Sequence, residues 1–229
     1  AHTEYLLNEG KIGADFSLSN HDVNLFSSIN NNQNTGYAGR IFGSKTFRKN
    51  NWTGTPTFEY QHINKRFHIL DRINDVEFAR DFNLVQEFSQ RTQNRFIFSF
   101  TNQWKEKAFL NYKINYLNEK DTYKGLKNDL DFGLKKGKFS TTGKFSHLNT
   151  GGSVEDTKFI RGHILNEWQG QKGNWGIGSS LEHNERRYKE TQRYDVSSFS
   201  WKEVFLQKKI GDSARTKLLA KMYFRDNDS

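Results

Sequence analysis

The chain has 229 residues, one proline and no cysteine, with a net charge of +9 and a mean hydropathy of −0.91. A chain of this length commonly forms one β-domain. The lack of cysteine excludes a disulfide framework and a thiolate metal site, and the lack of any run of about 18 apolar residues excludes a transmembrane helix. The start, Ala-His-Thr-Glu, carries no signal-peptide pattern, which we interpret as a mature chain or a fragment.

The N-terminal third contains strand-like runs separated by irregular segments. Lys11–Ser19 and Tyr37–Phe47 are predicted strands, and His21–Gly36, with its asparagine-rich run, is predicted to be a loop. Thr57–Gln61 is the next predicted strand. Pro56, which has no backbone N–H, fits the start of that strand or an edge strand.

Residues 62–94 are irregular and densely charged. Interleaved acids and bases of this kind indicate a salt-bridge network on a polar face or in a lumen, or alternatively a ligand site. The candidate ligand residues of this segment are Arg72, Asp75, Glu77, Arg80 and Asp81.

From Arg95 to Arg225 the chain reads as strands with alternating short and long connections. The clearest strand runs are Arg95–Asn102, Ala108–Leu117, Leu126–Leu134 and Phe139–Leu148. Connections predicted to be short are 103–107, 135–138, 169–173 and 207–214, and those predicted to be long are 118–125, 149–157 and 184–193. Hairpins with short turns at one end and longer loops at the other are typical of outer-membrane β-barrels, and also of some soluble barrels and sheets.

Each run alternates apolar and polar residues, as half-buried strands do. Tyr112 and Ile114, for example, alternate with Asn111 and Lys113. The apolar face meets lipid in a porin-like barrel and a protein core in a soluble one, and periodicity does not distinguish these. The predicted polar or lumen face carries Lys113, Lys127, Asp129, Asp131 and Lys221.

Several features bear on the choice between membrane and soluble barrels. Several strand runs have about 9–11 residues, the length of a tilted membrane-spanning strand. Trp104, Trp168 and Trp175 lie beside short turns, where an interfacial girdle places aromatic residues. The low hydropathy, and charges on apolar faces such as Glu203 between Trp201 and Phe205, favour the soluble alternative.

The sequence offers little sign of catalysis or of a cofactor. No histidine spacing supports a zinc site, and no nucleophile elbow, phosphate loop or dinucleotide fingerprint is present. Asp129 and Asp131 form a carboxylate pair on one strand face, which is more typical of solvation than of acid–base catalysis. Lysines 135, 136 and 138 lie in turns or opposite the aromatic face, so we expect no nucleic-acid partner.

Three segments carry a family resemblance: residues 20–28 (NHDVNLFSS), 36–38 (GYA) and 72–83 (RINDVEFARDFN). They resemble stretches of long outer-membrane and cell-envelope β-proteins of Bacteroidota. The resemblance implies a cell-envelope location and a non-enzymatic role, and carries over no functional residue.

These observations predict an all-β domain over residues 1–229, an antiparallel up-and-down meander of about 12–14 strands. We expect it to close into a barrel or to belong to a larger one, because an open sheet leaves exposed edges. The predicted function is an outer-membrane or cell-envelope β-barrel in transport, secretion or surface architecture, not an enzyme, without cofactor. The expected partners are outer-membrane lipid or lipopolysaccharide and other envelope proteins. The alternative is a soluble periplasmic or secreted β-module that binds an anionic or glycan ligand.

Overall fold

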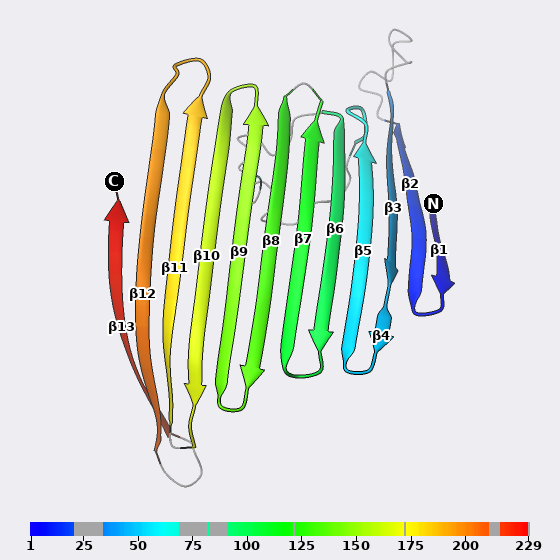
Figure 1. The fold of residues 1–229 in the computed structure, drawn as a ribbon. Helices are drawn as coiled ribbons and strands as arrows, with labels where there is room; N and C mark the ends of the chain where they lie inside the picture. Colours follow the sequence, from blue (N-terminus) through cyan, green and yellow to red (C-terminus); the bar gives the residue numbers. More distant parts are fainter. Residues whose placement is uncertain are drawn as a thin grey trace.

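The computed structural model describes residues 1–20, 34–68, 82, 91–120, 122–171, 173–210 and 216–228. They form a single 13-stranded sheet and contain no helix (Figure 1). Every paired strand runs antiparallel to its neighbour, and the order across the sheet follows the chain. The predicted all-β antiparallel meander is therefore confirmed.

The bounds of the strands are β1 His2–Leu7, β2 Gly10–Asn20, β3 Thr35–Lys45, β4 Phe47–Lys49, β5 Trp52–Ile63, β6 Gln93–Trp104, β7 Ala108–Glu119, β8 Tyr123–Lys136, β9 Phe139–Gly152, β10 Glu155–Gln169, β11 Gly173–Tyr188, β12 Tyr194–Ile210 and β13 Thr216–Asp228. Apart from the three-residue β4, the strands lengthen along the chain from 6 residues in β1 to 17 in β12, and the edge strand β13 has 13. Within the described ranges, β1 pairs only with β2 and β13 only with β12, so the sheet is open and closure into a barrel stays a prediction.

The connections distinguish the two ends of the sheet. The lower end in Figure 1 carries the turns that follow β1, β4, β6, β8 and β10, each of three residues or fewer. The upper end carries the two longest connections, residues 21–34 and 64–92.

The long connections predicted over 118–125, 149–157 and 184–193 are wrong. Residues 120–122 separate β7 from β8, residues 153–154 separate β9 from β10, and residues 189–193 separate β11 from β12. Backbone pairing between β8 and β9 continues beyond the residues that alternate between apolar and polar, and includes the pair Lys124 and Gly151. Ladder hydrogen bonds form whatever the side-chain polarity, so a prediction from apolar alternation ended these strands too early.

Pro56 lies within β5 rather than at its start or on an edge strand. Its neighbour β3 pairs with β5 as far as Thr57, and β4 resumes the pairing at Gly54. Thr55 and Pro56 therefore face the break between β3 and β4. A break in the ladder tolerates a residue that lacks an N–H donor.

Directly opposite residues of neighbouring strands project from the same face of a sheet, so the register defines two faces. The polar face includes the row Ser99, Lys113, Asp129, Ser146 and Arg161. The apolar face includes the row Phe100, Tyr112, Leu130, Phe145 and Gly162. The predicted alternation in β6, β7 and β8 is therefore confirmed.

The apolar face is exposed over the whole width of the sheet. By register, every exposed large hydrophobic side chain in the described residues, except Leu6 and Val154, belongs to it. Ile12 on β2, for example, is 48% exposed, and Leu206 on β12 is 58% exposed.

The prediction that Glu203 intrudes on the apolar face of β12 is wrong, and the charged residue that this strand places on the apolar face is Lys202, opposite Phe224. Glu203 pairs with Gly178, and Trp201 and Phe205 share its face, which is the polar one. Val204 and Leu206 occupy the apolar face of this strand, opposite Ile177 and Trp175.

The described residues bury few apolar side chains, and their one core cluster lies on the polar face near the upper end. Phe82, the described residue of the β5–β6 connection, is 1% exposed there. It packs against Leu117, Tyr123 and Leu148, with Phe159 beside them. No helix in the described ranges is long and apolar enough to cross a membrane.

Candidate functional site

An open depression of about 750 Å³ lies on the polar face over β6–β10. Two neighbouring cross-strand rows line it. One is the row from Ser99 to Arg161, and the next contains Thr101, Asn111, Asp131, Lys144 and His163. Its lining is polar because five successive strands place polar residues at matching register positions, while the intervening side chains project to the apolar face.

Four of the five residues predicted for the polar face line this depression. Lys113, Lys127, Asp129 and Asp131 come together there from β7 and β8. Lys221 does not join them, because it lies on β13 opposite Phe205, and its side chain is outside the described part of the structure.

The depression carries more cationic than anionic groups. Lys127 Nζ lies 3.8 Å from Asp129 Oδ2, and Arg161 Nε donates a 2.8 Å hydrogen bond to Glu182 Oε2. Lys113 and Lys144 are exposed, and neither forms an ion pair with any described residue. Since Asp129 and Asp131 are the only lining carboxylates, the site has a positive excess suited to an anionic ligand or ion.

Neutral polar groups complete the lining. His163 Nδ1 lies 2.6 Å from Ser180 Oγ in a hydrogen bond. The Oδ1 atom of Asn111 is buried and accepts no hydrogen bond from a described residue. A buried acceptor left unpaired costs about 1–3 kcal/mol, which a hydroxyl or amide donor entering the depression would offset.

Sequence reasoning missed Lys144 and Arg161. Both lie on strands that the sequence predicts, but the pairing of β8, β9 and β10 is what places Lys144 opposite Asp131 and Arg161 in the same cross-strand row as Asp129. An alternation pattern assigns each residue a face and gives no register between strands.

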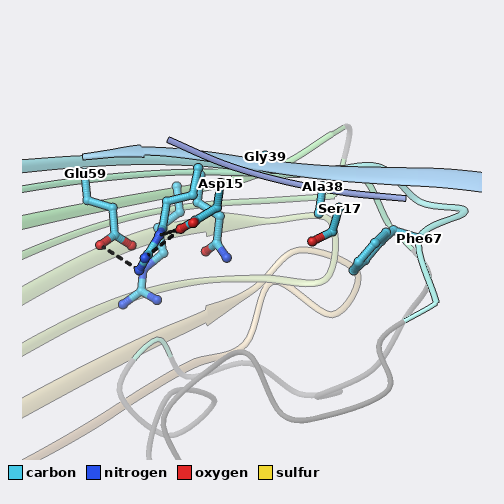
Figure 2. Close-up of a pocket in the computed structure, with 9 residues that line it drawn as sticks. Asp15, Ser17, Ala38, Gly39, Glu59 and Phe67 are labelled. Carbon is cyan, nitrogen blue, oxygen red and sulfur yellow. Dashed lines mark hydrogen bonds and ion pairs between the residues drawn. The ribbon is translucent and has the colours of Figure 1, made fainter. Parts of the chain in front are cut away.

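A second, smaller depression of about 240 Å³ lies on the polar face nearer the N-terminal edge (Figure 2). Arg40 Nε donates a 2.7 Å hydrogen bond to Asp15 Oδ2, and its Nη1 lies 3.7 Å from Glu59 Oε2. His2 Nδ1 is 2.5 Å from Asp15 Oδ1. Because these acids and bases compensate one another, we interpret the group as a structural charge network rather than a ligand site.

The charged candidates of the 62–94 segment lie outside the described residues. These are Arg72, Asp75, Glu77, Arg80 and Asp81.

The three tryptophans predicted for a girdle lie on the apolar face at the lower end. Trp168 is directly opposite Trp175, and Trp104 is directly opposite Trp52. The sequence analysis does not include Trp52 in this group, because the strand it predicts there begins at Thr57, whereas β5 begins at Trp52.

Among the described residues, no group of three or more metal-ligating side chains is placed to hold a metal ion. No protein-family model matches the chain, and no curated protein matches it.

Proposed function

We propose that this chain is a non-enzymatic β-barrel protein of the outer membrane or cell envelope, or a section of one. The supporting observation is the separation of its two faces. Large exposed apolar side chains occupy one face on every strand from β1 to β13, joined toward the upper end by charged residues such as Lys158 and Glu185, whereas the other face carries the charged depression. Apolar faces outward and polar faces inward are the pattern of a membrane barrel around a wet lumen.

An apolar face of this extent favours lipid as its neighbour. Burying apolar surface stabilises by about 25 cal/mol per Å², and large contiguous apolar patches mark interaction or membrane surfaces. Among the residues that the structure describes, the single sheet supplies no second protein layer over this face (Figure 1). Acyl chains remove it from water without further protein.

Strand length also supports the proposal. β6 and β7 each have 12 residues, which at roughly 3.3 Å per residue span about 40 Å. Tilted by about 45°, such a strand crosses the hydrocarbon layer of about 30 Å. In that setting the polar face lines a lumen, which fits a role in transport, secretion or surface architecture.

The test uses cysteine labelling, because the chain has no cysteine of its own. Lys144 and Phe145 are adjacent on β9, both exposed, and project to opposite faces. After reconstitution into lipid vesicles that the reagent can enter, Lys144→Cys should react with a charged maleimide. Phe145→Cys should react only after detergent solubilisation and unfolding.

A different labelling result would contradict the membrane proposal. A protein that stays monodisperse without detergent, and whose Phe145→Cys variant labels as fast as Lys144→Cys in the presence of vesicles, is not a membrane barrel. That result would favour the soluble ligand-binding module.

A further inference from the structure

Lysines accompany the aromatic rows of the apolar face at the lower end. Lys49 is directly opposite Trp52, which is directly opposite Trp104. Farther along the sheet the register gives the row Lys136, Phe139, Trp168 and Trp175. In both rows one exposed lysine ends a line of aromatic side chains on the same face.

Other lysines extend this group along the lower end. Lys105 and Lys107 lie in the β6–β7 turn, and Lys135 and Lys138 lie at the β8–β9 turn. With Lys49 and Lys136 they form a set of six exposed lysines, here called the lower rim. In the described part of the chain, no lower-rim side chain forms an ion pair or a hydrogen bond.

The upper end is arranged differently, because several of its basic residues are neutralised. Arg91 Nη1 lies 3.2 Å from Glu119 Oε2, and Lys189 Nζ lies 3.0 Å from Asp156 Oδ1. Arg193 also pairs with an acid, at 2.7 Å from Asp195 Oδ1. The lower rim has one acid among its six lysines, Glu106 of the β6–β7 turn, so a net positive charge beside exposed indoles distinguishes it.

We propose that the lower rim binds the phosphate groups of anionic phospholipids in the leaflet at the short-turn end. This inference rests on the proposed membrane function. Indole rings favour the headgroup level of a bilayer, and lysine side chains extend their ammonium groups from an apolar surface toward the water. Clustered lysines near a membrane surface attract anionic lipid, with each lysine contributing about fivefold in binding.

The experiment compares brominated lipids as quenchers of one tryptophan. The full chain, retaining Trp104 alone with the other tryptophans changed to Phe, is reconstituted into phosphatidylcholine vesicles. These contain a fixed fraction of brominated phosphatidylglycerol or, separately, brominated phosphatidylcholine. The ratio of the two quenching efficiencies gives the relative binding of anionic over neutral lipid at the lower rim.

We expect a preference of several-fold for the anionic lipid, lost in the Lys49→Gln/Lys107→Gln variant. The matched control is Lys120→Gln/Lys124→Gln, which removes two exposed lysines at the upper end and should keep the preference. Equal quenching by both lipids in the parent protein would overturn the inference and leave the membrane proposal standing. Absence of quenching by either lipid would instead overturn the membrane proposal itself.

Discussion

The Tyr123 hydroxyl donates a hydrogen bond to the backbone carbonyl of Phe82, a residue 41 positions earlier in the chain. Phe82 belongs to the connection between β5 and β6, yet it packs over β7, β8 and β9. The polar face thus contains an apolar cluster near its upper end, formed by Phe82, Leu117, Tyr123 and Leu148. In the proposed barrel this places part of the β5–β6 connection inside the lumen.

The first prediction concerns the hydroxyl of Tyr123. Tyr123→Phe leaves the buried Phe82 carbonyl without its donor, so the free energy of unfolding should fall by about 1–3 kcal/mol. Denaturant titration in detergent micelles measures this. The control is Tyr112→Phe, because the Tyr112 hydroxyl donates a 2.8 Å hydrogen bond to Asn128 at an exposed position. An equal decrease in the free energy of unfolding in both variants would contradict a buried hydrogen bond between Tyr123 and Phe82.

The second prediction concerns the space above Gly125. A Cβ at this position would lie 2.9 Å from Phe82 Cδ1 and 2.6 Å from the Tyr123 hydroxyl oxygen. Gly125→Ala should therefore destabilise the protein by about 1–3 kcal/mol through overpacking. Gly151→Ala is the control, because a Cβ there meets only Asp156 Oδ1 at 3.5 Å.

A double variant separates overpacking from other effects of the added methyl group. If Phe82 causes the clash, Gly125→Ala should cost less in a Phe82→Ala background than alone, because contacting sites are not additive. The same cost in both backgrounds would show that the closer contact with the Tyr123 hydroxyl, rather than with Phe82, limits the space at Gly125.

Much of the fold could be predicted from the alternation of apolar and polar residues alone. The even positions of β7, including Tyr112 and Ile114, were assigned to one face, and the register confirms this. The lengths of the turns could not be predicted as well. Polar residues at strand ends, such as Lys124, pair with the neighbouring strand although no apolar alternation marks them as strand. The position of Phe82 could not be predicted from the sequence, because it depends on packing between segments far apart in the chain.

The candidate site was accessible in part. Lys113, Lys127, Asp129 and Asp131 were assigned to one polar face from the sequence, since two adjacent predicted strands supply all four. Lys144 completes their surroundings from β9, and its neighbours follow from inter-strand register rather than from local pattern.

The third prediction compares two tryptophans on opposite faces. Trp175 lies on the apolar face at the lower end, whereas Trp201 lies on the polar face opposite Ser180. In vesicles, a variant with Trp175 alone should be quenched strongly by lipids brominated near the headgroup. A variant with Trp201 alone should be quenched instead by aqueous iodide. Similar lipid quenching of both would show that the two faces are not divided between lipid and water.

The fourth prediction concerns ion selectivity. If the polar face lines a conducting lumen, the unpaired charges of Lys113 and Lys144 favour anions there. Lys113→Gln/Lys144→Gln removes two positive charges from the depression, so the reversal potential in a salt gradient across a planar bilayer should shift toward cation preference. Lys49→Gln/Lys136→Gln removes the same charge from the apolar face and should shift it far less. Equal shifts would place the selectivity outside the depression, because lumen electrostatics depends on where charge lies, not only on how much is removed.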